Sequence, residues 1–204
     1  MTSPRPRKKH FSMIRSFHLA DLLTIANGFC GAAALFEAMR FLATHVRWHL
    51  DAAAVLIPLA LVFDLLDGRV ARWRHEASAM GRELDSLADV ISFGVAPAGI
   101  AFASGVDSVL DQIILMFFVA CGVSRLARYN VTAEAFAADT GKVDHFEGTP
   151  IPTSIVPLAV LMLAFHRGNL YPVRLLGMEV HLVAFIFLVS GALMISKTLK
   201  IPKP

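Results

Sequence analysis

The stretch FDLLDGRVARWRHEASAMGRELDSLADVISFGVAPA, from Phe63 to Ala98, carries four aspartates at the ends of two long apolar runs. Asp64 and Asp67 are three residues apart, and Asp85 and Asp89 are four residues apart. Because residues three or four positions apart lie on one face of a helix, each pair shares a helical face. The polar hairpin between the two runs would turn these faces toward each other. The stretch therefore predicts two adjacent helices whose carboxylates meet.

The composition of the whole chain extends this pair of helices into a membrane bundle. Its 204 residues are 56% apolar and 17% charged, whereas soluble domains average roughly 45–50% apolar and about 25% charged. A helix needs about 20 residues to cross a bilayer. Six segments approach this length: 19–42, 52–73, 85–104, 108–128, 151–166 and 178–197. We therefore predict an all-α integral membrane protein with six transmembrane helices, of which the fifth is the least regular because prolines crowd its start.

These segments belong to a single membrane domain. Residues 1–18 are expected to form a cytoplasmic or interfacial segment, 19–197 the six-helix bundle and 198–204 a cytoplasmic tail. Within the first segment, Phe11 to Phe17 mixes apolar residues with basic and polar ones, which predicts a short N-terminal interfacial helix. The polar stretch 130–149 is interpreted as a surface loop or an interfacial helix.

Basic residues indicate how the bundle lies in the membrane. Lys and Arg collect on the cytoplasmic side of membrane proteins, and most of the 19 basic residues share one side if the N-terminus is cytoplasmic. Both termini and the four aspartates then face the cytoplasm, in a multi-pass protein of the cell membrane. The net charge of +3 fits such a surface without nucleic acid as a partner. Cys30 and Cys121 lie in apolar runs and are interpreted as small buried hydrophobes.

The four aspartates point to a divalent metal. Carboxylates at membrane depth are costly, and four that converge repel one another unless cations or protons compensate them. Oxygen-only ligands favour Mg²⁺ or Mn²⁺, with Ca²⁺ also possible in a crystal, over zinc. A cluster of this size is large enough for two ions, which would polarise a pyrophosphate and neutralise a leaving phosphate. Phosphoryl chemistry is therefore the natural use of the cluster.

Residues between the aspartates fit that chemistry. Gly68 and Gly81 remove side chains where a bulky ligand needs to approach the backbone. Arg72, one turn beyond Gly68, offers a fixed cation for phosphate. Each of these residues alone is also explained by helix packing or by membrane anchoring.

In this spacing the stretch resembles the signature of the CDP-alcohol phosphotransferase family, D-x2-D-G-x2-A-R followed by x8-G-x3-D-x3-D. The matching residues are Asp64, Asp67, Gly68, Ala71, Arg72, Gly81, Asp85 and Asp89. The resemblance implies a six-helix membrane fold that is usually a homodimer, with membrane lipids around it. It also implies that Asp64, Asp67 and Asp85 are metal ligands. Asp89 would contribute to a second metal and act as the general base on the acceptor hydroxyl. Gly68, Ala71, Arg72 and Gly81 would receive the cytidine diphosphate.

Flanking segments resemble the branch of this family that uses L-serine as the acceptor and CDP-diacylglycerol, or an ether-lipid analogue, as the donor. These segments are ELDSLADVISFGVAPA, SRLARYN, FEGTPIP and ADLLTIANGFCG. The last contains Thr24 and Asn27, which are assigned either to the nucleotide and its lipid or to hydrogen bonds between helices. Arg125 and Arg128 are candidates for the serine carboxylate or the lipid phosphate, with membrane anchoring as the alternative. Glu147 is a candidate for the acceptor entrance.

Two other interpretations stay open. A sister enzyme of the same family would use inositol phosphate, glycerol phosphate or choline, and a phosphate-bearing acceptor would need extra basic residues near the cluster. A membrane metal-ion transporter also uses intramembrane aspartates. Against the transporter, the aspartates gather at one membrane face and are interleaved with Gly68 and Arg72.

Overall fold

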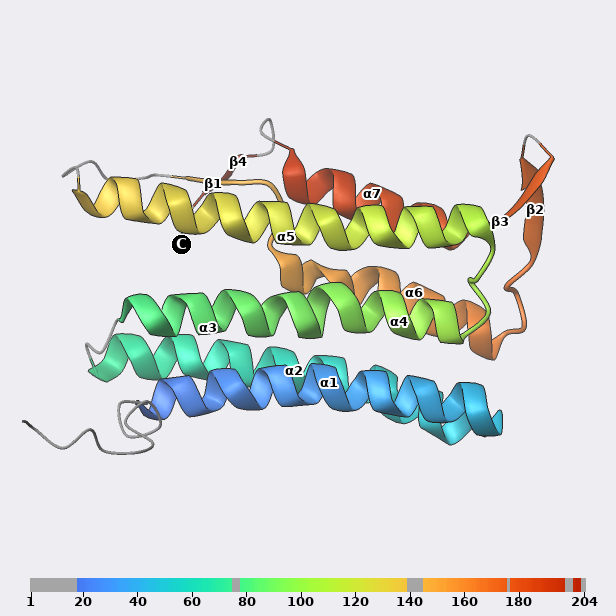
Figure 1. Ribbon diagram of the computed structural model, residues 1–204, viewed down its shortest axis with the longest axis horizontal. Coiled ribbons are helices and arrows are strands. Elements are labelled where there is room, and N and C mark those ends of the chain that lie inside the picture. The colour runs from blue at the N-terminus through green and yellow to red at the C-terminus, as the bar shows by residue number, and fades with distance from the viewer. Residues whose placement is uncertain (1–17, 75–77, 139–144, 176, 197–199, 203–204) are drawn as a thin grey trace, which may run out of the picture.

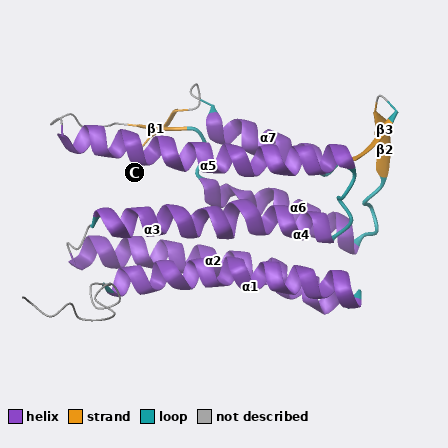
Figure 2. Cartoon of the chain, viewed as in Figure 1, coloured by secondary structure: helices purple, strands orange, loops and turns teal. Residues whose placement is uncertain are grey.

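The computed structural model describes residues 18–74, 78–138, 145–175, 177–196 and 200–202, and they are mostly helical (Figure 2). The helices are α1 (Leu19–Thr44), α2 (Arg47–Arg74), α3 (Ala79–Asp89), α4 (Ala96–Ala103), α5 (Val109–Ala138), α6 (Ile155–His166) and α7 (Ala184–Ile195). A π-helical turn, η2 (Val90–Val95), joins α3 to α4, and a 3-10 turn, η3 (Ile151–Ser154), precedes α6. Because α3, η2 and α4 continue as one rod, the described residues form six helical rods (Figure 1).

Four of these rods are long and apolar enough to cross a membrane. They are Leu19–Thr44, Arg47–Arg74, Met80–Ala103 and Val109–Thr132. The first four predicted segments are therefore confirmed as candidate spans, although the second and third helices each begin about five residues earlier than expected. Helices α6 and α7 are apolar but have only 12 residues each.

Two later segments also differ from their predictions. The sixth predicted segment, 178–197, is wrong at its start, because Met178–His181 is strand β3, paired antiparallel with β2 (Pro172–Leu175). Gly177, with φ of 84°, provides the left-handed backbone of the tight turn between them. The stretch 130–149 begins as a helix, because α5 continues to Ala138. The interfacial helix predicted before residue 18 lies outside the described residues.

Helices α1 and α2 form an antiparallel hairpin, and both helices bury small residues. Ala34 and Ala38 of α1 and Ala53 and Ala60 of α2 are all at most 3% exposed. Small side chains allow two helical backbones to approach closely in a membrane, where dispersion contacts replace the hydrophobic drive. His45 ends α1 in the left-handed conformation, and its N–H donates to the carbonyl of Phe41. Because the two helices run antiparallel, the start of α1 lies beside the end of α2, where Thr24 Oγ1 donates to Oδ2 of Asp67.

Three aromatic rings join the other half of the bundle. Phe93 of η2, Phe118 of α5 and Phe187 of α7 are at most 1% exposed. Phe118 and Phe187 meet edge to face, with ring centroids 5.3 Å apart, a geometry that aromatic quadrupoles favour. This contact places α7 against α5, on the side of α5 that faces away from α1 and α2 (Figure 1).

Short strands close the loops of the bundle. The β2–β3 hairpin stands at one end (Figure 1), and β3 is tied to the start of α5 through Asp111, whose carboxylate accepts from the N–H of His181 at 2.9 Å. At the other end, β1 (His145–Glu147) pairs antiparallel with β4 (Lys200–Pro202). The chain then turns through Gly148, with φ of 74°, toward η3 and α6.

Candidate functional site

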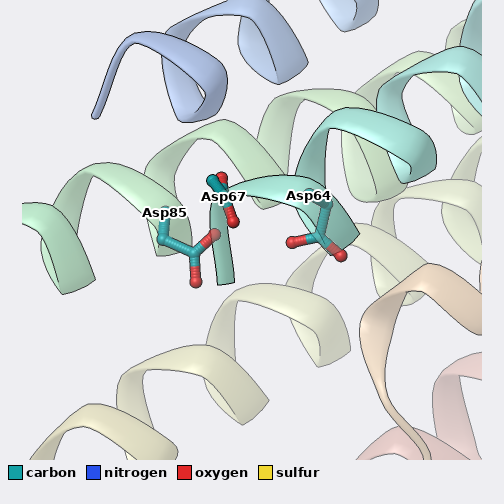
Figure 3. A group of neighbouring side chains, drawn as sticks. All are labelled: Asp64, Asp67 and Asp85. Atoms are coloured by element: carbon teal, nitrogen blue, oxygen red, sulfur yellow. The ribbon is translucent and has the colours of Figure 1, made fainter. Parts of the chain in front are cut away.

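Three carboxylates from two helices meet at one place. Asp64 and Asp67 of α2 and Asp85 of α3 each offer one oxygen atom, and these atoms lie within 4.8 Å of one another (Figure 3). Asp67 is 5% exposed, and the other two are half-buried. The predicted meeting of the two aspartate pairs is therefore found in the structure. We call these three residues the acidic trio.

The fourth aspartate lies one turn beyond the trio. Asp89 is 7% exposed and is within electrostatic range of the carboxylates of Asp64 and Asp85. It is the last residue of α3 and directly precedes the π-helical turn η2. Such turns interrupt an α-helix at a local cost in hydrogen-bond geometry and are frequent at functional sites. All four predicted carboxylates thus belong to one cluster.

Helix α1 supplies hydrogen bonds to two of these carboxylates. Thr24 Oγ1 donates to Oδ2 of Asp67 at 2.6 Å, and Asn27 Nδ2 donates to Oδ1 of Asp89 at 3.1 Å. Thr24 is 4% exposed and Asn27 is 0% exposed. In turn, Ser92 Oγ of η2 donates to the backbone carbonyl of Asn27 at 2.8 Å. These contacts join α1 to α2 and to the helix that contains α3 and η2.

A fifth carboxylate, Asp21, borders the cluster. It is 6% exposed, and a Cβ atom built on Gly81 would lie 2.9 Å from its Oδ1. Gly81 therefore lets the first turn of α3 approach α1. Asp21 was not singled out as a site residue, although a signal existed: Asp21, Thr24 and Asn27 recur every three residues within the otherwise apolar stretch 19–36, which predicts one polar helical face.

The remaining signature residues continue along α2 beyond the trio. A Cβ atom at Gly68 would lie 3.7 Å from a terminal nitrogen of Arg72, an ordinary contact distance. Arg72 is exposed and Ala71 is half-buried. Gly68, Ala71 and Arg72 thus form a partly accessible surface on the turn of α2 that follows Asp67.

Two half-buried arginines of α5 carry unsatisfied donors. Arg125 Nε and Arg128 Nη2 are buried and have no hydrogen-bond acceptor among the described residues. Arg125 is within electrostatic range of Asp89. Glu147 lies in β1, where its backbone pairs with Lys200, and its side chain is outside the described part of the structure. The arginines therefore offer donors for an anion beside the cluster.

Helix α5 is also fastened to α3 by a network that sequence reasoning missed. Asn130 Nδ2 donates to Ser86 Oγ at 3.0 Å and to Oε1 of Glu83 at 3.2 Å. Ser86 Oγ donates to Asn130 Oδ1 at 3.2 Å. Because Ser86 directly follows Asp85, the network holds the arginine-bearing end of α5 beside the trio. Only the identity of Asn130 at the end of SRLARYN could have indicated it.

The donor set fits a divalent cation. Every side chain of the trio offers oxygen, the ligand that Mg²⁺ and Mn²⁺ prefer. Oδ1 of Asp85 is buried and has no hydrogen-bond donor among the described residues. A buried carboxylate oxygen without a donor is costly, and a bound cation would compensate it. The trio is therefore a suitable metal site.

Comparisons with known proteins agree with this chemistry. A family model described as CDP-alcohol phosphatidyltransferase matches residues 17–195. A CDP-diacylglycerol–serine O-phosphatidyltransferase of Saccharomyces cerevisiae is 45% identical over 204 residues, covering 96% of this chain and 74% of that protein. An archaetidylserine synthase of Methanothermobacter thermautotrophicus is 34% identical, covering 87% of this chain and 67% of that protein. A CDP-diacylglycerol–serine O-phosphatidyltransferase of Helicobacter pylori is 35% identical, with 86% and 68% covered.

Proposed function

The chain belongs to the CDP-alcohol phosphatidyltransferase family, and from that premise we propose that it is a phosphatidylserine synthase. It transfers the phosphatidyl group of CDP-diacylglycerol, or of an ether-lipid analogue, to the hydroxyl of L-serine and releases CMP. The relatives from yeast and Helicobacter pylori, named for this serine reaction, support the acceptor. The structural observation that carries the proposal is the meeting of the acidic trio, with Asp89 buried beside it.

The family is metal-dependent, and we assign the metal to the acidic trio, with Asp89 contributing to a second ion. Mg²⁺ or Mn²⁺ bound there would neutralise the charge of the pyrophosphate and of the leaving phosphate. The protein's own part is to hold the carboxylates of two helices together against their mutual repulsion. The hydrogen bonds from Thr24 and Asn27 contribute to this.

Asp89 is assigned as the general base. The O–H bond of serine breaks, its proton passes to the Asp89 carboxylate, and the serine oxygen forms a bond to the lipid-bearing phosphorus. The bond from that phosphorus to the oxygen of the CMP phosphate breaks, and its electron pair leaves with CMP. A carboxylate buried beside other carboxylates is a suitable proton acceptor, because a proton there relieves like-charge repulsion.

The substrates are assigned to the surfaces around the cluster. Gly68, Ala71, Arg72 and Gly81 form the surface for the cytidine diphosphate. Arg125 and Arg128 are proposed for the serine carboxylate or the lipid phosphate, because Arg125 Nε and Arg128 Nη2 are buried and have no acceptor in the described part of the chain. Glu147 is proposed to lie at the acceptor entrance; it is the last residue of β1, just before the turn at Gly148 that leads to η3 and α6.

The membrane arrangement completes the proposal. The chain is a multi-pass membrane protein with four candidate spans, and we propose that α6 and α7 add a fifth and a sixth. The active site and both termini face the cytoplasm, as the distribution of basic residues predicts. The working unit is proposed to be a homodimer.

The acceptor is tested with purified full-length protein, labelled CDP-diacylglycerol, Mg²⁺ or Mn²⁺, and a panel of alcohols. We expect CMP release with L-serine and none with inositol phosphate, glycerol phosphate or choline. CMP release with one of the other alcohols would make the chain a sister enzyme. No CMP with any alcohol, together with ion flux in liposomes, would make it a transporter.

The base is tested with Asp89→Asn. Its kcat is expected to fall by about 100-fold or more, because general-base catalysis contributes that much, while CDP still binds. The matched control is Asp107→Asn, which changes an exposed carboxylate in the loop before α5 and should leave kcat unchanged. Near-normal turnover of Asp89→Asn would refute the assignment.

A further inference from the structure

Asn27 controls one of the two oxygens of Asp89. It is 0% exposed, and its Nδ2 donates to Oδ1 of Asp89 at 3.1 Å. A donor held at one carboxylate oxygen fixes the rotation of the carboxylate about its side-chain bond. The other oxygen, Oδ2, then keeps a defined direction. This matters for a general base, since a misplacement of about 1 Å costs up to about 100-fold in rate.

The backbone of Asn27 is itself held in place by Ser92. Ser92 Oγ donates to its backbone carbonyl at 2.8 Å. Ser92 reaches this carbonyl because Gly31 has no side chain: a Cβ atom there would lie 2.6 Å from Ser92 Oγ and 2.7 Å from Ser92 Cα. Ser92 belongs to η2, which directly follows Asp89. Asn27, the donor, lies on α1, and Asp89, the acceptor, directly precedes η2. The hydrogen bond from Ser92 joins these two segments.

Thr24 makes the equivalent contact one turn earlier. Its hydroxyl donates to Oδ2 of Asp67 at 2.6 Å, and residues three positions apart share a helical face. One face of α1 therefore places a single donor on a single oxygen of each of two carboxylates. A nucleotide contact would not require this pairing.

We propose that Asn27 is the positioning residue of Asp89, holding Oδ1 so that Oδ2 faces the hydroxyl of the acceptor. The proposal rests on the proposed function, in which Asp89 removes the acceptor proton. Proton transfer then runs from the acceptor oxygen to Oδ2, while Oδ1 stays with Asn27. In this proposal Asn27 does not bind the nucleotide, which is bound by residues of α2 and α3.

The test replaces Asn27 by leucine, which has nearly the same shape and lacks the donor. Oδ1 of Asn27 is buried and has no hydrogen-bond donor among the described residues, so the substitution removes an unsatisfied acceptor. It also leaves Oδ1 of the buried Asp89 without its donor, which costs stability, so folding of the variant is checked by its melting temperature before the kinetics are measured. The full-length protein is purified in detergent with Mn²⁺. The measurements are kcat, the KM for serine, and the Kd of CDP by calorimetry in the absence of serine.

We expect Asn27→Leu to lower kcat by about 10- to 100-fold, with the KM for serine and the Kd of CDP within about threefold of wild type. The matched control is Thr44→Val, which makes a similar polar-to-apolar change at the far end of α1, where the hydroxyl hydrogen-bonds to the backbone of Arg40 and Val46. This control should leave all three quantities unchanged.

Two results would overturn the proposal. One is a kcat within about twofold of wild type. The other is a Kd of CDP raised about tenfold with kcat intact, which would make Asn27 a nucleotide-binding residue. If Asn27→Leu does not fold, Asn27→Ser takes its place, and loss of the fold in both variants would make the role structural and refute the proposal. If wild type itself releases no CMP with serine, the proposed function fails instead.

Discussion

Gly31→Ala tests how closely α1 must approach the helix that bears Asp89. A Cβ atom at this position would lie 2.6 Å from Oγ, 2.7 Å from Cα and 2.9 Å from the backbone nitrogen of Ser92. The hydroxyl could rotate away, but the backbone atoms cannot. The alanine is therefore accommodated only if α1 and η2 move apart, and this movement stretches the hydrogen bonds of Asn27 to Ser92 and Asp89.

The magnitude follows from two contributions. Overpacking of a tight contact costs about 1–3 kcal/mol, and the weakening of a typical hydrogen bond costs about 1 kcal/mol. The sum is roughly 2–4 kcal/mol of unfolding free energy. For a chain of this length that corresponds to a melting temperature lower by roughly 5–15 °C. We also expect kcat to fall, because the Asp89 carboxylate loses its fixed direction.

The assay is thermal melting of the detergent-solubilised protein, followed by kcat with serine. Gly28→Ala is the matched control on the same helix, because its Cβ would lie 3.5 Å from Cβ of Ala88, an ordinary contact. We expect the control to melt within about 2 °C of wild type. Equal melting temperatures for Gly31→Ala, Gly28→Ala and wild type would refute the close approach of α1 to η2.

Three further changes test other parts of the structure. Gly148→Ala should destabilise the protein more than Gly168→Ala: both glycines have positive φ, which costs alanine about 1–2 kcal/mol, but only at Gly148 would Cβ also meet a backbone carbonyl of α7. Equal melting temperatures for the two variants would contradict this. Asp111→Asn removes a fully buried charge that accepts from the backbone and ring of His181. Limited proteolysis in the β2–β3 hairpin should therefore be faster in this variant, and an unchanged rate would show that Asp111 does not hold the hairpin in place. Asp85→Asn should abolish the rise in melting temperature that Mn²⁺ gives wild type, whereas an undiminished rise would exclude Asp85 as a ligand.

The sequence predicted the centre of the site because helical periodicity alone determines it. Spacings of three and four put Asp64 with Asp67 and Asp85 with Asp89, and a short connection between two apolar helices makes them neighbours. The first four membrane helices followed from their length and hydropathy for the same reason. Each of these inferences depends on residues that are close in sequence.

Features that depend on distant contacts could not be predicted in this way. Met178–His181 directly precedes the apolar run of α7 and therefore falls within the sixth predicted helix, but it pairs with β2 and is anchored by Asp111, which lies 70 residues before His181. Likewise, the polar residues after Asn130 suggested either a surface loop or a separate interfacial helix, whereas α5 continues through them to Ala138. Tertiary contacts decided both cases, because a hydropathy pattern does not record the partner of a polar side chain.

The role of helix α1 could be predicted from the sequence only in part. Its polar residues follow a helical period that is visible in the sequence, but their acceptors are 43 residues away for Thr24 and 62 for Asn27. Four carboxylates on α2 and α3 would repel one another and splay the two helices apart. A third helix that donates to Asp67 and Asp89 opposes this repulsion in the absence of substrate. The carboxylate cluster is therefore held by three helices, and the signature on α2 and α3 does not include the donors that α1 supplies.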